Sequence, residues 1–181
     1  MYFLNYAIGI IGALLSKFGL PDTSPDFSLN GSVLFNTFTF ISVVILAPIF
    51  EELIFRGMIL NTLTKYNKMF AIIVTSLLFG LLHLNITQAI PAFFMGLVLC
   101  YMYLKSDSIL VTMLAHAGNN FLALMSAYSN NIMITVLVLS LVIYGLITVV
   151  LKSKEINEFI KEEKTNENWY VRFFKQIDRK S

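Results

Sequence analysis

The sequence predicts an all-α protein, a polytopic transmembrane helix bundle of about six spans. Of its 181 residues, 57% are hydrophobic and only 13% are charged, whereas about 25% of the residues in an average soluble domain are charged. The mean hydropathy is +0.74. The apolar residues are gathered into runs that approach the roughly 20 residues a membrane-spanning helix needs. These observations exclude a water-soluble domain and favour a chain surrounded by the lipid bilayer.

The length of each apolar run defines the expected spans. They cover about residues 2–20, 32–66, 69–86, 89–104, 108–128 and 132–151. The second run is too long for one straight span, and Pro48 offers a natural kink or break. The first run has no basic residues ahead of it and no small-residue cleavage site, so we interpret it as a retained helix and not a signal peptide. We expect a membrane-embedded domain over residues 1–151 and a charged cytosolic tail over residues 152–181.

The basic residues between the spans predict the orientation. Lys65 and Lys68 follow the second span, Lys105 follows the fourth, and the tail follows the sixth, so all fall on one side of the membrane. Because basic loops stay in the cytosol, we expect a multi-pass protein of the cell membrane with both termini cytosolic. Lys17 is the exception to this pattern. The tail holds eight of the 13 Lys and Arg residues but also six acids, which does not indicate a nucleic-acid partner.

A few ionisable groups fall inside the expected spans. They are Glu51, Glu52, Arg56, His83 and His116. Each charge at a bilayer centre costs roughly 2.5–3.5 kcal/mol even on insertion scales, so such groups are candidates for a functional site. Counted from the expected cytosolic loops at about 1.5 Å per residue, Glu51 and His83 lie about 20 Å deep, and His116 and Asn120 lie about 14–20 Å deep. The sequence therefore predicts that three helices bring polar groups to one level.

Helical geometry separates the two glutamates of the stretch EELIFRG, residues 51–57. Glu52 and Arg56 are four residues apart with the acid first, which is the favourable order for an ion pair. Glu51 lies about 140° around the helix from Arg56 at about 100° per residue. We infer that Glu52 and Arg56 neutralise each other, and that Glu51 faces a cavity as a partly desolvated carboxylate able to act as a general base. The alternative without a catalytic role is that the charges of residues 51–57 form a cap near a cytosolic interface.

The stretch HAGNN places two further polar side chains on one helical face. His116 and Asn120 are four residues apart, and a neutral imidazole N–H with a carboxamide could stabilise an oxyanion. Asn119 is the alternative to Asn120. His83 could orient a water molecule or share its proton with Glu51. Taken singly, a membrane histidine is more often a hydrogen-bonding residue between helices.

Three segments together resemble the signatures of the CPBP family, the CAAX-protease and bacteriocin-processing (Abi) family. That family carries E-E-x-x-x-R, F-x-x-x-H and H-x-x-x-N on successive membrane helices, which correspond here to Glu51–Arg56, Phe79–His83 and His116–Asn120. The resemblance covers about residues 45–125. It implies an intramembrane endopeptidase that acts on a membrane-associated peptide or protein, with peptide processing or bacteriocin self-immunity as its role.

The resemblance also implies residue roles. Glu51 with His83 would activate the hydrolytic water, His116 with Asn120 would hold the oxyanion, and Glu52 and Arg56 would support them. The family is usually called metalloprotease. A Zn²⁺ site made from Glu51, His83 and His116 is chemically allowed, but the paired-histidine motif H-E-x-x-H is absent from the sequence. We therefore expect glutamate-activated water and leave zinc open.

Two other classes of function fit buried Glu and His residues. One is a non-catalytic membrane protein that confers immunity by binding a bacteriocin receptor. The other is a proton-coupled transporter, against which stands the lack of an internal repeat in the sequence.

Overall fold

The computed structural model describes residues 16, 17, 19, 31–128, 154, 155 and 158. The described part is all helical, as predicted, and contains no strand. The expected spans over residues 2–20 and 132–151 fall almost wholly outside these residues, as does nearly all of the tail. Six spans with both ends in the cytosol therefore stay a prediction.

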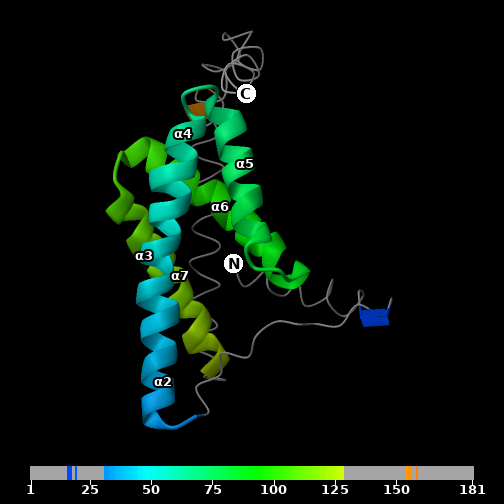
Figure 1. The fold of residues 1–181 in the computed structure, drawn as a ribbon, viewed down its shortest axis with the longest axis vertical. Helices are drawn as coiled ribbons and strands as arrows, with labels where there is room; N and C mark the ends of the chain where they lie inside the picture. The colour runs from blue at the N-terminus through cyan, green and yellow to red at the C-terminus, as the bar shows by residue number, and fades with distance from the viewer. Residues whose placement is uncertain (1–15, 18, 20–30, 129–153, 156–157, 159–181) are drawn as a thin grey trace, which may run out of the picture.

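One long helical segment, Val33–Leu63, forms the first half of the fold (Figure 1). Its 31 residues are long and apolar enough to cross a membrane. The Ser32 hydroxyl caps it by accepting a bond from the Phe35 N–H at 3.3 Å. The segment consists of α2 (Val33–Phe40), the π-helix η1 (Ile41–Leu46), α3 (Ala47–Glu52), the π-helix η2 (Leu53–Leu60) and α4 (Asn61–Leu63).

Pro48 changes the winding of this segment but does not break it. Proline has no N–H, and in an α-helix its ring would crowd the carbonyl four residues earlier. In η1 the chain is wound more widely, so that the Ala47 N–H bonds the Ser42 carbonyl five residues back. The Val43 carbonyl therefore receives no hydrogen bond from the Ala47 N–H. Pro48 cannot supply one either, because proline has no N–H. A π-turn thus takes the place of the predicted kink, and it leaves one carbonyl open inside the fold.

The helices α5 (Lys68–Leu81) and α6 (Ile86–Ser106) form an antiparallel hairpin (Figure 1). The helix α5 begins at the Asn67 side chain, which accepts a bond from the Phe70 N–H at 2.8 Å. It ends earlier than the predicted residue 86, and α6 begins earlier than the predicted residue 89. The chain reverses within four residues because Leu84 takes a left-handed conformation, with φ of 52°.

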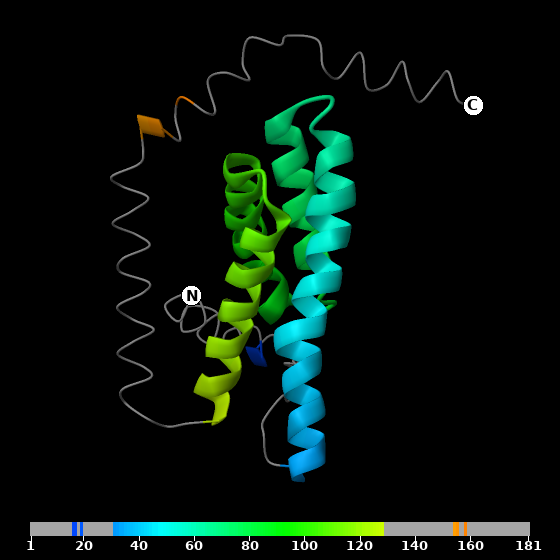
Figure 2. The ribbon, with the colours of Figure 1, turned by 90° about the vertical axis from the view of Figure 1, so that its left-hand side faces the viewer.

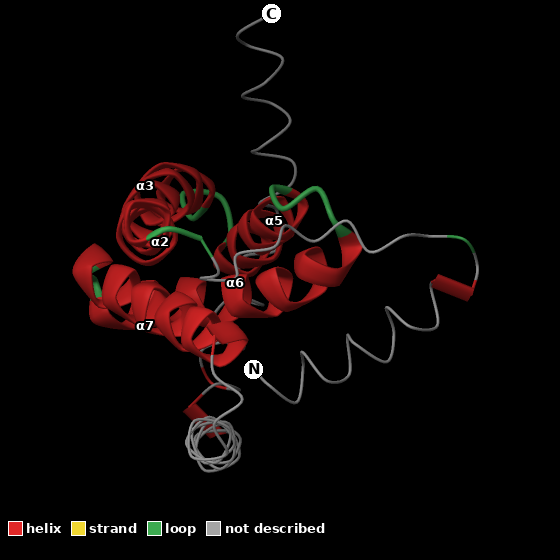
Figure 3. Cartoon of the chain, turned by 90° about the horizontal axis from the view of Figure 1, so that it is seen from below, coloured by secondary structure: helices red, strands yellow, loops and turns green. Residues whose placement is uncertain are grey.

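Helix α7 (Ile109–Tyr128) packs against α3 and η1 (Figure 2). Viewed from below, the helices form one bundle with α7 and α6 side by side (Figure 3). The turns that carry Lys65 and Lys105 lie at the same end, because Asn61 Nδ2 donates to the Tyr103 hydroxyl at 2.8 Å. These basic turns therefore share one side, as the sequence predicted.

The surface of this bundle is rich in large apolar side chains, and its interior holds a pair of charged ones. Large apolar side chains of the long segment are exposed, such as Val33 at 85% and Phe38 at 62%, whereas the side chains of Glu52 and Arg56 are 0% exposed. Apolar surfaces of this extent mark contact with lipid or protein. Two apolar clusters fill the interior, one around Leu60 and Cys100 and one around Phe55 and Phe79. Cys100 is fully buried in the first of these clusters.

Glycines let α5 and α6 approach to backbone contact. A Cβ atom on Gly80 would lie 2.7 Å from the Ala89 carbonyl oxygen. An alanine in a helix is normally better than glycine by about 1 kcal/mol, but overpacking costs about 1–3 kcal/mol. We therefore expect Gly80→Ala to lower the thermal unfolding midpoint of the purified protein in micelles. Gly118→Ala is the matched control, because nothing lies within 4 Å of its Cβ. Equal midpoints for the two variants would contradict this packing.

Candidate active site

A buried ion pair lies at the centre of the described helices. Arg56 Nη1 donates to Glu52 Oε1 at 2.8 Å, and both side chains are 0% exposed. The predicted pairing of these residues is therefore present, although residues 53–60 are wound as a π-helix. Because both charges are removed from solvent, each depends on the other for stability. The pair is a fixed part of the interior of the bundle.

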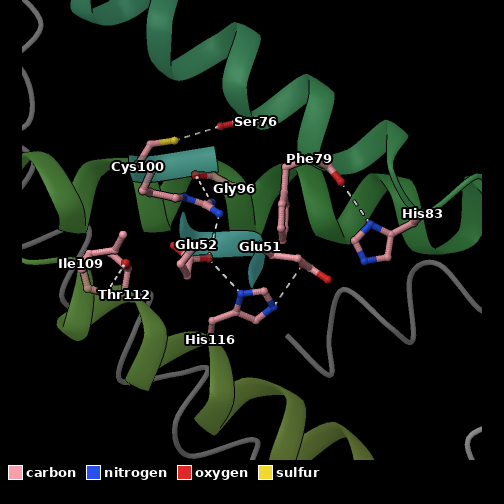
Figure 4. Close-up of polar contacts among 11 residues, drawn as sticks. Glu51, Glu52, Ser76, Phe79, His83, Gly96, Cys100, Ile109, Thr112 and His116 are labelled. Carbon is pink, nitrogen blue, oxygen red and sulfur yellow. Dashed lines mark hydrogen bonds and ion pairs between the residues drawn. The ribbon is translucent and has the colours of Figure 1, made fainter. Parts of the chain in front are cut away.

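His116 joins this pair from α7. Its Nδ1 lies 2.9 Å from Glu52 Oε1, the same oxygen that accepts from Arg56 (Figure 4). The ring nitrogen is thus the donor, and a neutral imidazole has only one N–H. In a neutral ring Glu52 already accepts this hydrogen, so Nε2 has none to donate to an oxyanion, and the predicted oxyanion role of His116 stays a prediction. Only a doubly protonated ring leaves Nε2–H as a second donor.

Glu51 is the more accessible of the two glutamates. Its side chain is 22% exposed, and its Oε2 lies 3.8 Å from His116 Nε2, which is too far for a direct hydrogen bond. It also interacts electrostatically with His83. Helical geometry predicted that Glu51 and Glu52 would face different surroundings, and they do. Glu51 is left with a carboxylate that can bind a water molecule.

His83 approaches Glu51 from the opposite side. Its ring lies across the Glu51 carboxylate from His116 (Figure 4). His83 Nδ1 donates to the Phe79 carbonyl at 3.1 Å, so Nε2 of a neutral ring is an acceptor. The bond is possible because α5 ends at Leu81, which places His83 just beyond the helix. The predicted meeting of polar groups from three segments is therefore present for Glu51, His83 and His116.

Phe79 is the residue of this site that the sequence analysis left without a role. Its ring centroid lies 5.6 Å from that of His83 and 5.6 Å from that of His116, with both rings edge-on. The Arg56 guanidinium carbon lies 4.7 Å from the Phe79 ring centroid, a cation–π contact. Phe55 packs against it at 5.1 Å. Phe79 therefore fixes the positions of both histidines. Its place four residues before His83 was the available signal.

Asn120 lies one helical turn beyond His116, and its side-chain amide closes the gap left by the π-turn. Its Nδ2 donates at 2.9 Å to the Val43 carbonyl, which Pro48 leaves open. Asn119 Nδ2 in turn donates to Asn120 Oδ1 at 3.2 Å, which fixes the orientation of the Asn120 amide. A carboxamide nitrogen carries two hydrogens, so one remains after the bond to Val43. Asn119 and Asn120 thus act together, where the sequence analysis treated them as alternatives.

The proposed zinc ligands do not meet as a metal site in this geometry. Among the described residues, no group of three His, Cys, Asp or Glu side chains is arranged to hold a metal ion. His116 Nδ1 and Glu52 Oε1 are already bonded to each other.

Comparison with known proteins places this site in a family. The family model described as type II CAAX prenyl endopeptidase Rce1-like matches residues 33–122. This match contains all three motifs on which the site is built. The chain belongs to the CPBP family. The match begins earlier than the predicted residue 45 and so includes α2 and η1, whose Val43 carbonyl holds Asn120.

A curated relative of this CPBP chain is the "Putative membrane peptidase YdiL" of Bacillus subtilis (strain 168). It is 34% identical over 83 residues, which are 45% of this chain and 34% of the relative. The chain thus matches about a third of the relative's length. No solved structure matches the chain. Family membership and the apolar helices together place the protein in a membrane.

Proposed function

We propose that this protein is an intramembrane endopeptidase that hydrolyses peptide bonds of a membrane-associated peptide or protein. The observation that carries the proposal is the contrast between the two glutamates. Glu52 is fully buried and bonded to Arg56 and His116, whereas Glu51 is 22% exposed and lies between two histidine rings. A structural ion pair would need no second carboxylate at this depth. Glu51 is costly to place here and free to react.

In the proposed reaction Glu51 takes a proton from a water molecule, with His83 Nε2 orienting that water. The hydroxide oxygen bonds to the carbonyl carbon of the scissile peptide, whose oxygen becomes an oxyanion. The remaining N–H of Asn120 and the Nε2–H of a doubly protonated His116 donate to this oxyanion. The C–N bond then breaks, and Glu51 passes its proton to the leaving amine, which restores the carboxylate.

Glu52 orients His116 for this role. The His116 Nδ1–H stays bonded to Glu52 Oε1 at 2.9 Å, so the ring keeps its orientation while its Nε2 faces the substrate. Glu52 and Arg56 thereby support the reaction without touching the substrate.

The substrate class follows from the depth of the site and from the family. A peptide bond must enter the apolar interior to reach Glu51, so the substrate is itself apolar or anchored in the membrane. The family model is described as a prenyl endopeptidase, and the relative is named a membrane peptidase. We propose peptide processing or bacteriocin self-immunity as the cellular role.

The proposal is tested with the purified 181-residue chain in lipid bicelles and a library of apolar peptides. We expect cleaved products, detected by mass spectrometry, and we expect cleavage to persist after treatment with a metal chelator, because the described residues assemble no three-ligand site. Loss of cleavage with chelator and its return with Zn²⁺ would contradict the metal-free reaction. Absence of any product across the library, with the protein folded, would contradict the peptidase.

A further inference from the structure

Helix α6 carries none of the three family motifs, yet it contacts the buried charge network. Arg56 Nη2 donates to the Gly96 carbonyl at 3.3 Å, while Nη1 of the same guanidinium donates to Glu52 at 2.8 Å. The Phe79 ring covers the guanidinium at 4.7 Å. Arg56 is therefore held by α6 as well as by its own helix.

The approach of α6 to the network depends on the absence of a side chain at Gly96. A Cβ atom there would lie 2.9 Å from Ser76 Cα and 3.0 Å from Ser76 Cβ. Ser76 is fully buried, and its hydroxyl lies 3.8 Å from the Cys100 sulfur, one turn beyond Gly96 on α6. Since these neighbours are backbone and short side chains, they cannot move aside as the end of a long side chain would. An added Cβ must push α5 and α6 apart.

Such a displacement would break the bond between Arg56 and Gly96 first. This bond is 3.3 Å long, already at the long end of the range for N–H···O bonds. Arg56 Nε has no hydrogen-bond partner in the described part of the chain. Loss of the bond to the Gly96 carbonyl would therefore leave a second buried nitrogen of Arg56, Nη2, without this acceptor, which is costly. The guanidinium would shift to find another acceptor.

A shift of Arg56 reaches His116 through one shared atom. Glu52 Oε1 accepts both from Arg56 and from His116 Nδ1, at 2.8 and 2.9 Å. The other oxygen of Glu52, Oε2, has no hydrogen-bond partner in the described part of the chain. The carboxylate can therefore rotate to follow a displaced Arg56. The contacts therefore run from the Gly96 carbonyl through Arg56 and Glu52 to His116. The side chains of Arg56 and Glu52 are fully buried.

We propose that Gly96 is a positioning residue. Because it has no side chain, its carbonyl on α6 comes close enough to bond Arg56, and this bond fixes the orientation of the His116 ring through Glu52. The importance of that ring for cleavage rests on the proposed function, whereas the coupling itself does not. The coupling can therefore be measured by a readout that needs no substrate.

The sequence offers such a readout because it contains two histidines. In protein labelled with ¹⁵N-histidine, both rings are expected to carry a hydrogen on Nδ1, since His83 Nδ1 donates to a carbonyl and His116 Nδ1 to a carboxylate. The variant His83→Gln assigns the remaining signals to His116. In Gly96→Ala, we expect the His116 Nδ1 signal to shift, because its bond to Glu52 changes, while the His83 signals stay.

Peptide cleavage by the same variant gives the second readout. We expect kcat of Gly96→Ala to fall by about 10²-fold, as misplaced reacting groups do, with KM nearly unchanged. Gly57→Ala is the matched control, because its Cβ would meet the flexible end of Ile109 at 3.4 Å and the Glu52 backbone oxygen at 3.9 Å, both ordinary van der Waals distances, and it should leave both readouts as in the wild type. The double variant Ser76→Gly/Gly96→Ala removes part of the clash and should recover part of kcat and of the His116 signal.

The outcomes separate this inference from the proposed function. A folded Gly96→Ala protein with wild-type His116 signals and wild-type kcat would overturn the positioning role. Should that variant not fold, Arg56→Lys takes its place, because one ammonium can pair with Glu52 but does not also reach Gly96, and it should give the same change at His116. Wild-type His116 signals in the lysine variant would overturn the role as well. A wild-type protein that shows the coupling but cleaves no peptide would support the positioning and contradict the peptidase.

Discussion

Glu51→Gln is expected to lower kcat for peptide cleavage by about 10²–10⁴-fold, the contribution of a general base, with little change in KM. Glutamine keeps the shape of the side chain but cannot take a proton from water. Because Glu51 Oε2 lies 3.8 Å from His116 Nε2, beyond hydrogen-bond distance, the substitution removes no hydrogen bond to that ring. The thermal midpoint in micelles should therefore stay at or above that of the wild type. Cleavage rates and melting curves of the two proteins provide the measurement.

Glu52→Gln is the matched control, since it makes the same chemical change one residue away. That side chain is 0% exposed and accepts from both Arg56 and His116, so its replacement should lower the melting midpoint as well as activity. Wild-type cleavage by Glu51→Gln would remove Glu51 from the reaction. In cells, a protective phenotype that survives Glu51→Gln would favour the non-catalytic immunity protein over the peptidase.

The sequence predicted the features of this site that depend on local spacing. The ion pair between Glu52 and Arg56 follows from their spacing of four residues along a helix. It is present although residues 53–60 form a π-helix, because the two residues remain on neighbouring turns. The approach of His83 to Glu51 follows from the rise per residue along two antiparallel helical segments, whereas their depth in the membrane stays a prediction. These quantities are properties of a single helix, so the sequence is sufficient to predict them.

The contacts that the sequence did not predict join residues far apart in the chain. His116 and Glu52 are 64 positions apart, and Asn120 and Val43 are 77. Which glutamate receives the histidine depends on the rotation of α7 against α3, and that rotation is set by packing along both helices. The open Val43 carbonyl depends on how the chain accommodates Pro48. A proline in a sequence indicates a disturbance of the helix but not whether it becomes a kink or a π-turn.

The second large effect is expected for the buried charges and concerns stability. Arg56→Met should destabilise the protein by about 3–5 kcal/mol, because it leaves the Glu52 carboxylate buried without its charged partner. Methionine is long enough to fill much of the space above the Phe79 ring, so lost volume contributes little. Unfolding of the purified protein in mixed micelles, followed by circular dichroism, measures the change.

The double variant Glu52→Gln/Arg56→Met distinguishes a lost charge partner from lost packing. With both charges removed, no buried ion remains uncompensated, and the double variant should be more stable than Arg56→Met alone. His116 can still donate from Nδ1 to the glutamine carbonyl, so its contact with α3 is retained. A double variant as unstable as Arg56→Met would show that the guanidinium acts through its contacts with Phe79 and Gly96 and not through its charge. The recovery, if found, would show that the Glu52 carboxylate is tolerated at full burial only while a charged partner compensates it, a requirement that Glu51, at 22% exposed, does not share to the same degree.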